Sequence, residues 1–222
     1  MIQFQAVIFD LDGTILDTLE DIQSAVNRVL NENGFPTREL DFVRRAVGNG
    51  MRELIRRSLP PERQGNDALI SRCTAQMKEY YLTHWSEKTQ PYPGIHELLC
   101  FLKEAGIPSA VLTNKPDAVA KRMVPHWYGD IPFACVLGDR NGVPRKPDPT
   151  VALAIARQLD AEPERVLFVG DSSPDIMTAK NAGMVSAGVL WGFRSERELR
   201  EAGADFIAHT PQDLIRLIQE RK

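Results

Sequence analysis

Two aspartates, Asp10 and Asp12, directly follow the apolar run FQAVIF (4–9). A carboxylate beside a buried strand needs a cation or a proton nearby, because burial disfavours its charged form. Asp10, at the end of the run, is placed to attack an electrophile as a carboxylate nucleophile. Asp12 can lend its backbone carbonyl to a metal and its side chain as a general acid and base. The pair predicts group-transfer chemistry supported by a cation.

Other apolar runs end in polar residues of complementary chemistry. Thr113 and Asn114 follow one run, Lys146 lies in the loop RKPDP, and Asp171 and Asp175 follow the run VLFVG. Loops at the carboxyl ends of strands meet in an open α/β sheet, so these side chains should share one space. A hard divalent cation would balance the carboxylates, and Mg²⁺ suits one or two of them together with a phosphate. These loops hold no His or Cys, which argues against Zn²⁺ there.

Residues next to the two aspartates could hold a phosphate group. Gly13 permits a backbone in which successive N–H groups turn toward phosphate oxygens. Thr14 and Thr113 offer hydroxyl donors, and Lys146 would neutralise charge on the phosphoryl oxygens. We also expect Asn114 to contact a phosphate oxygen. The sequence thus favours a phosphorylated substrate.

Each of these residues, taken singly, has a structural interpretation. An Asp-x-Asp pair is more often a turn or a helix cap than a catalytic pair, and we expect Asp17 and Thr18 to cap the helix that follows. Lys115 could point toward the site or away from it. The complete set, in this order and at strand ends, favours chemistry over the structural interpretation.

The elements that must position these residues alternate between strands and helices. Short apolar runs of strand length recur along the chain: FQAVIF (4–9), SAVLT (109–113), ACVLG (134–138), VLFVG (166–170), VSAGVL (185–190) and DFIAH (205–209). Helical patterns separate the later runs, and several of these end at glycine. This rhythm predicts an α/β fold with a doubly wound, mostly parallel, Rossmann-like sheet.

The alternation is interrupted after the first strand. Residues 17–86 show amphipathic helical patterns and no clear strand, which predicts an inserted helical cap domain. The core domain would then comprise residues 1–16 and 87–222. The segment QPYPG (90–94) is a plausible hinge between the two.

Composition excludes several classes of protein. The net charge of −3 over 222 residues provides no basic field for nucleic acid, and no apolar segment is long enough to span a membrane. No signal peptide is evident. Cys73, Cys100 and Cys135 form no Cys-x-x-Cys pair, and we expect neither a disulfide framework nor a zinc site. The four histidines show no paired spacing and are expected in surface or core positions. We expect a cytoplasmic protein.

The sequence resembles the haloacid dehalogenase-like phosphohydrolase superfamily in four motifs. These are DLDGT (10–14), LTN (112–114), the lysine of RKPDP (Lys146) and GDSSPD (170–175). The resemblance implies that Asp10 is the nucleophile and Asp12 the acid and base. It implies Mg²⁺ held by the Asp10 carboxylate, the Asp12 carbonyl and Asp171, with Asp175 supporting the metal's waters or Lys146. The helical insert resembles the family's mobile cap.

The phosphoglycolate phosphatase-like branch of this superfamily is the most similar. The segment VGNG, with Gly48, Asn49 and Gly50, resembles a cap loop that approaches the substrate, and it also fits a plain turn between helices. Arg52 and Arg56 could reach a substrate carboxylate or lie on a solvated helix face. The resemblance therefore extends from the core motifs into the cap.

The leading hypothesis is a Mg²⁺-dependent phosphatase that acts on a small phosphorylated metabolite, first of all 2-phosphoglycolate, through an aspartyl-phosphate. Pyrophosphatase and sugar-phosphate phosphatase or mutase activities stay open, because the core motifs do not report the leaving group. A phospho-acceptor signalling domain would be shorter and would lack the insert. A 2-haloacid dehalogenase would not need Asp12. Either a monomer or a homodimer fits.

Overall fold

A single parallel sheet forms the centre of the molecule. The computed structural model describes residues 3–220, so the ends of the predicted core domain, residues 1–2 and 221–222, lie outside it. The six strands are ordered β5-β4-β1-β6-β7-β8, and every neighbouring pair is parallel. Their bounds are β1 (Ala6–Phe9), β4 (Ser109–Pro116), β5 (Val136–Asp139), β6 (Val166–Gly170), β7 (Val185–Val189) and β8 (Phe206–Ala208). The six predicted strands and the fold class are confirmed.

Helices cover both faces of this sheet. Alternate residues of β1 point to opposite sides: Val7 and Phe9 join one hydrophobic cluster, and Ala6 and Ile8 join the other. The first cluster is closed by α5 (Ile95–Glu104), α6 (Asp117–Tyr128) and α10 (Pro211–Glu220), and the second by α7 (Thr150–Gln158) and α8 (Ser173–Asn181). The remaining core helices are η2 (Pro163–Arg165) and α9 (Glu196–Glu201). Burial on both faces explains why the strands are continuous apolar runs.

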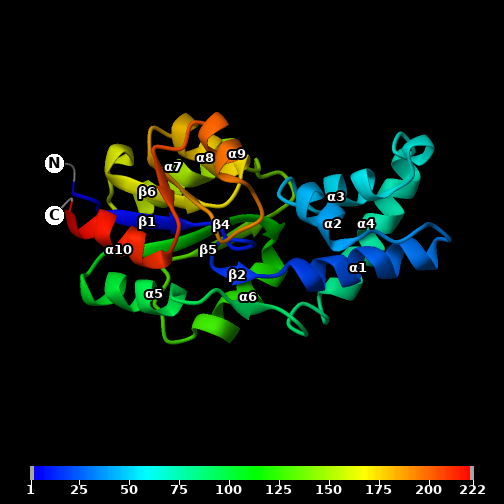
Figure 1. Cartoon of the computed structure of the whole chain (residues 1–222), viewed down its shortest axis with the longest axis horizontal. Coiled ribbons are helices and arrows are strands. Elements are labelled where there is room, and N and C mark those ends of the chain that lie inside the picture. Colours follow the sequence, from blue (N-terminus) through cyan, green and yellow to red (C-terminus); the bar gives the residue numbers. More distant parts are fainter. Residues whose placement is uncertain (1–2, 221–222) are drawn as a thin grey trace.

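Four α-helices form a separate layer at one end of the core (Figure 1). They are α1 (Leu19–Glu32), α2 (Leu40–Ala46), α3 (Met51–Ser58) and α4 (Asp67–Tyr81), with the short η1 (Pro61–Arg63) before α4. On α1 the buried residues include Ile22, Val26 and Val29, which share the predicted face. These helices fall inside the predicted insert, residues 17–86, and are called the cap below. The exact domain boundary stays a prediction.

The two chain segments that join cap and core lie side by side. A two-residue strand β2 (Leu16–Asp17) pairs antiparallel with β3 (Gln90–Pro91), a ribbon that the sequence did not indicate. Just beyond it, the buried carboxylate of Asp21 accepts hydrogen bonds from the backbone N–H of Lys88 at 3.1 Å and of Thr89 at 2.9 Å. It also accepts one from the Thr89 hydroxyl at 2.7 Å. One carboxylate thus fastens the returning chain to the first cap helix.

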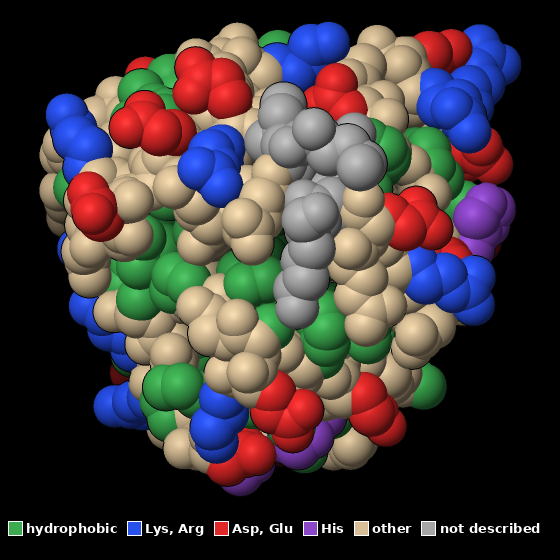
Figure 2. Space-filling view, turned by 90° about the vertical axis from the view of Figure 1, so that its left-hand side faces the viewer, with side chains coloured by type: hydrophobic (Ala, Val, Ile, Leu, Met, Phe, Trp, Pro, Cys, Tyr) green, Lys and Arg blue, Asp and Glu red, His purple; other side chains and the backbone are tan. Residues whose placement is uncertain are grey.

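The end of the core farthest from the cap carries charged side chains of both signs. In Figure 2, basic and acidic side chains are interspersed on this face, with hydrophobic ones between them. The described side chains of this face therefore form no continuous basic surface. No helix between residues 3 and 220 is both long and apolar enough to cross a bilayer.

Candidate active site

The carboxyl ends of three adjacent strands bring the predicted residues together. Asp10 follows β1, and its N–H donates to the Val169 carbonyl of β6 at 2.9 Å. Thr113 lies near the end of β4, and Asp171 directly follows β6. Because β4 and β6 flank β1, these side chains meet above the centre of the sheet. They line one pocket between core and cap, together with Asp12, Asn114, Lys115, Lys146 and Ser172.

Lys146 lies between two of the carboxylates. Its Nζ is 2.7 Å from Oδ1 of Asp10 and 2.5 Å from Oδ1 of Asp175, and all three side chains are buried. Burial alone would lower the pKa of Lys146, but the two carboxylates hold that pKa above its ordinary value. The other oxygen of Asp175 accepts from the N–H and hydroxyl of Ser172 at 3.0 and 2.6 Å. Asp175 therefore positions Lys146, one of the two roles that the resemblance implies.

The carboxylates carry more negative charge than this lysine can balance. Ligand oxygens of Asp10, Asp171 and Asp175 lie within 4.8 Å of one another. Burial and then the charge of Asp175 raise the pKa of Asp10 to about 7. Burial and then the charges of Asp175 and Asp10 raise the pKa of Asp171 well above its ordinary value. A site of buried oxygens that is short of positive charge fits a hard divalent cation.

A second ion pair, made by Lys115, holds Asp12. The Lys115 Nζ donates to Oδ1 of Asp12 at 2.7 Å and to the Tyr81 hydroxyl, at the end of α4, at 3.0 Å. The Thr18 hydroxyl donates to the same Asp12 oxygen at 2.7 Å. Thr18 does occupy the N-cap position of α1, but its side chain makes no cap hydrogen bond, so the prediction of a capping side chain is wrong for Thr18. Its hydroxyl orients Asp12 instead.

The predicted phosphate-binding residues are placed unequally. Gly13 has φ +82°, and a Cβ there would lie 2.4 Å from Oδ2 of Asp171, so only glycine fits. The same Oδ2 of Asp171 accepts a hydrogen bond from the Phe193 N–H at 2.7 Å, which fixes this carboxylate. Thr113 lines the pocket, whereas Thr14 is fully buried, is not among the lining residues, and its hydroxyl has no hydrogen-bond partner among the described residues. Of the two threonines, only Thr113 therefore lines the pocket.

Asn114 connects two loops beside the pocket. Its side-chain N–H groups donate to the carbonyls of Gly48 at 3.0 Å and Lys146 at 3.2 Å, and its Oδ1 accepts from the Lys146 N–H at 3.0 Å. Both ends of the amide are therefore engaged by backbone. Asn114 lines the pocket and holds the Lys146 loop and the cap loop against each other, and its contact with a phosphate oxygen stays a prediction.

The cap loop VGNG reaches the pocket, but the arginines after it do not. Val47, Gly48 and Gly50 line the pocket, and Asn49 is not among the lining residues. Arg52 donates to Asp67 at 2.9 Å and to Ser71 at 2.8 Å, both on α4. Arg56 pairs with Glu53 on its own helix. These charges are satisfied within the cap, which favours the solvated-face interpretation, and a contact of Arg52 with the substrate stays a prediction.

A residue outside the four motifs supplies a cation at the cap loop. Arg194, from the core loop after β7, lines the pocket and donates to the carbonyls of Arg44 and, at 2.6 Å, Val47. The rest of the cap side of the pocket is mainly apolar. Its side chains are Ile22, Met51, Leu54 and Met77, with Tyr81 at the edge.

Comparisons with known proteins agree with this site. The family model described as haloacid dehalogenase-like hydrolase matches residues 7–189. The chain therefore belongs to the haloacid dehalogenase-like hydrolases. The match includes the whole helical cap and most of the parallel core that Figure 1 shows.

Relatives place the chain in one branch of the family. It is 32% identical over 213 residues to phosphoglycolate phosphatase 1 of Pseudomonas aeruginosa, covering 94% of this chain and 78% of the relative. It is also 32% identical to the phosphoglycolate phosphatase of Mannheimia succiniciproducens, over 97% of this chain and 99% of that one. A crystal structure from Lactobacillus delbrueckii subsp. bulgaricus has a TM-score of 0.90 at 30% identity, over 97% and 98% of the two chains. The branch is the phosphoglycolate phosphatase-like one, and the protein is an enzyme.

Proposed function

We propose that this protein is a Mg²⁺-dependent phosphatase of small phosphomonoesters, with 2-phosphoglycolate as the first candidate substrate. The phosphoric monoester hydrolase class is supported by the family and by the relatives named as phosphoglycolate phosphatases. The observation that carries the mechanism is the buried Asp10 carboxylate at the end of the central strand, beside Lys146 and two further carboxylates.

Asp10 acts as the nucleophile in the first step. One of its oxygens bonds to phosphorus while the bond from phosphorus to the ester oxygen breaks, giving an aspartyl-phosphate and an alkoxide that takes a proton from Asp12. In the second step Asp12 removes a proton from water, which attacks phosphorus and releases inorganic phosphate from Asp10. Lys115 and Thr18 both donate to Oδ1 of Asp12, so Oδ2 is the oxygen left to carry the proton.

The other core residues stabilise charge. Lys146 and the Thr113 hydroxyl would contact the phosphoryl oxygens as negative charge moves onto them. A Mg²⁺ ion held by Asp10, the Asp12 carbonyl and Asp171 would supply further positive charge where the site is short of it. Asp175 keeps Lys146 in place.

The cap bears on the identity of the leaving group. Its apolar side chains suit a small organic group. Arg194, which also lines the pocket, places a positive charge next to the cap loop, where it donates to the Val47 carbonyl. The core fold is shared with a β-phosphoglucomutase from Clostridium difficile, at a TM-score of 0.78 and 22% identity. Fold alone therefore does not separate a phosphatase from a mutase, and sugar-phosphate and pyrophosphate substrates belong in the test. Cytoplasmic location and a monomer or homodimer remain predictions.

The test is phosphate release from a panel of 2-phosphoglycolate, pyrophosphate and sugar phosphates. We expect turnover with Mg²⁺, none with excess EDTA, and none in Asp10→Asn. Asp17→Asn, at the exposed residue of β2, is the matched control and should keep its activity. A folded protein that releases phosphate from no ester would overturn the proposal. Preference for another ester would correct the substrate and leave the mechanism intact.

A further inference from the structure

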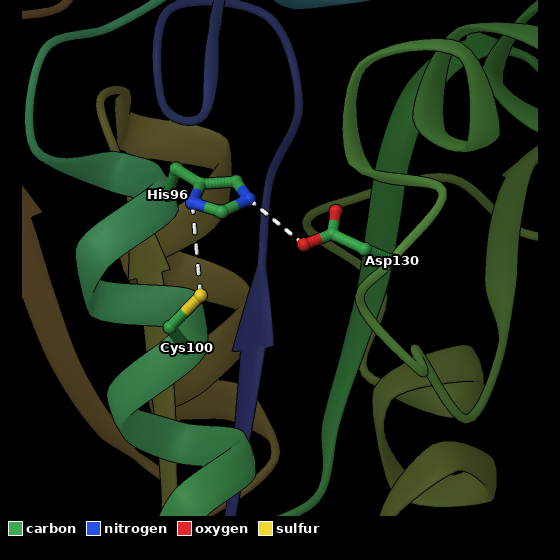
Figure 3. Close-up of side chains that lie close together, drawn as sticks. All are labelled: His96, Cys100 and Asp130. Atoms are coloured by element: carbon green, nitrogen blue, oxygen red, sulfur yellow. Dashed lines mark hydrogen bonds and ion pairs between the residues drawn. The ribbon is translucent and has the colours of Figure 1, made fainter.

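Away from the active site, three side chains with nitrogen, sulfur and oxygen donors meet on the flank of the core. His96 and Cys100 lie one turn apart on α5, and Asp130 lies in the loop after α6 (Figure 3). The His96 Nδ1 is 3.6 Å from the Cys100 Sγ, and the His96 Nε2 is 3.0 Å from Oδ2 of Asp130. One donor atom from each residue lies within 4.8 Å of the other two. The imidazole thus has a thiol on one side and a carboxylate on the other.

The separation of nitrogen and sulfur is that of two ligands on one metal ion. Zinc binds sulfur at about 2.3 Å and imidazole nitrogen at about 2.0–2.1 Å, and a tetrahedral angle between these bonds puts the two ligands about 3.6 Å apart. The observed hydrogen-bonded contact of 3.6 Å already has this separation, so an ion could bind if the two side chains turn without moving apart. A thiolate and an imidazole select Zn²⁺ or a related transition ion over Mg²⁺. This flank and the active site therefore suit different metals.

Asp130 has the position that a carboxylate takes behind a metal-binding histidine. When Asp130 accepts a hydrogen bond from the His96 Nε2–H, the lone pair of Nδ1 faces Cys100 (Figure 3). Such partners fix the tautomer and ring orientation of the histidine and make it a stronger ligand. Lys103, also on α5, donates to the Asp130 carbonyl at 3.1 Å and so holds the loop against the helix.

We propose that His96 Nδ1 and Cys100 Sγ bind a Zn²⁺-class transition-metal ion, with Asp130 positioning the imidazole. Water fills the remaining coordination positions, for which the exposed side chains leave room: His96 is 51% and Asp130 57% exposed. On binding, the Cys100 thiol loses its proton to solvent, so affinity falls as the pH is lowered. From the sequence no zinc site is expected; the proposal rests on the four-residue interval between His96 and Cys100, which a helix brings onto one face.

The same three residues also resemble a thiol nucleophile with its base. That function requires an enclosed site with donors for an oxyanion, and this cluster is open to solvent. The exposure and the tetrahedral separation favour the metal. The proposal does not depend on the phosphatase activity.

Titration with Co²⁺, in excess Mg²⁺ to occupy the carboxylate site, tests the proposal by spectroscopy. A thiolate-to-cobalt charge-transfer band in the near ultraviolet should rise to one equivalent and be displaced by Zn²⁺. The band should be lost in Cys100→Ser and in His96→Ala. It should persist in Cys135→Ser, a matched change at another half-buried thiol. Asp130→Asn should weaken binding about 10- to 100-fold.

Three results would overturn these assignments. Absence of the band in the wild-type protein, or its persistence in Cys100→Ser, would remove the site. Unchanged affinity in Asp130→Asn would remove the positioning role of that residue. Rapid alkylation of Cys100 by iodoacetamide that depends on His96, without any cobalt band, would support the thiol nucleophile instead.

Discussion

The core side of the active-site pocket, called the floor, and its cap side, called the roof, differ in where they hold charged side chains. The floor, from the core, holds its charges buried and in direct contact: Lys146 bridges Asp10 and Asp175 with its side chain 3% exposed. The roof, from the cap, offers apolar side chains such as Leu54 and Met77 to the pocket. The cap places its ion pairs outside, as with Arg52 and Asp67. The contrast indicates that the core determines the chemistry and the cap determines what fits.

Floor and roof are joined by a few polar contacts, each of which reaches from a catalytic loop to the cap. Arg194 donates to carbonyls at the end of α2, and Asn114 donates to Gly48. Lys115 links Asp12 to Tyr81. A change in the position of the cap would therefore also affect the groups that orient Asp12, the proposed acid and base.

Removal of the central charge of the floor should have the largest effect. Lys146→Met would leave buried carboxylates without their lysine and the phosphoryl oxygens without a cation. We expect kcat to fall about 10²- to 10³-fold. The measurement is steady-state phosphate release with Mg²⁺. Lys121→Met, at a half-exposed lysine on α6, should be nearly silent. A loss below tenfold in Lys146→Met would contradict its proposed role.

The joint between floor and roof can be loosened at Asp21. Its carboxylate accepts three hydrogen bonds from Lys88 and Thr89, and Asp21→Asn removes the charge and part of the accepting capacity. Hydrogen bonds to a charged group contribute about 1.5–3 kcal/mol, so we expect the free energy of unfolding to fall by about 2 kcal/mol. Urea denaturation measures this difference. Asp41→Asn, on an exposed side chain of α2, serves as the control, and equal stability of the two variants would disprove the anchoring role.

A smaller change removes the contact between the cap residue Tyr81 and Lys115, which holds Asp12, the proposed acid and base. Tyr81→Phe removes one hydrogen bond to Lys115 and leaves the ring in place. The donor is the charged Lys115, and hydrogen bonds of this kind contribute about 1.5–3 kcal/mol. Because Lys115 keeps its bond to Asp12, we expect the low end of this range and a fall in kcat of about tenfold. A change confined to KM would show that Tyr81 only shapes the pocket. Tyr80→Phe, whose ring stacks on His84, is the matched control.

The smallest effect is expected at the outer charges of the cap. Hydrogen bonds from Arg56 and Arg57, opposed in part by burial, lower the pKa of Glu53 to about 2. Because the folded-state pKa is depressed, Glu53 stabilises the fold above its ordinary pKa, and this contribution disappears as the pH falls through about 2. Solvent screening limits it to about 1 kcal/mol.

The measurement is urea denaturation of wild type and Glu53→Gln at several pH values. The two curves should differ at pH 7 and converge at the acid end. A difference that stayed constant with pH would show that the ionisation of Glu53 is not its source.

The sequence predicted the floor far better than the roof. Strand runs and the loops that follow them are local patterns, so β1, β4 and β6 and the positions of Asp10, Lys146 and Asp171 could be inferred directly. The side-chain partners could not. The sequence around Thr18 predicts a helix cap, but in the structure its hydroxyl donates to Asp12. Nothing in the sequence near Tyr81 indicates its hydrogen bond with Lys115.

The sequence was least informative where a polar side chain had two possible partners. Asn114 and Arg52 were expected on the substrate, and both are engaged by protein groups brought in from distant segments. The helix α10 and the ribbon of β2 and β3 also went unrecognised, the ribbon because each strand has only two residues. A choice between competing partners depends on tertiary packing, which a local pattern does not contain.

The central place of β1 has a consequence for how the protein is made. Val7 pairs with Ser109 on one side and with Leu167 on the other, so this strand is synthesised well before either of its partners. Until β6 has been synthesised, this apolar segment has an unpaired edge, which favours aggregation and contact with chaperones. Nascent chains that stop before Asp171 cannot assemble the carboxylate cluster. The carboxylate cluster therefore forms only after synthesis has passed Asp175.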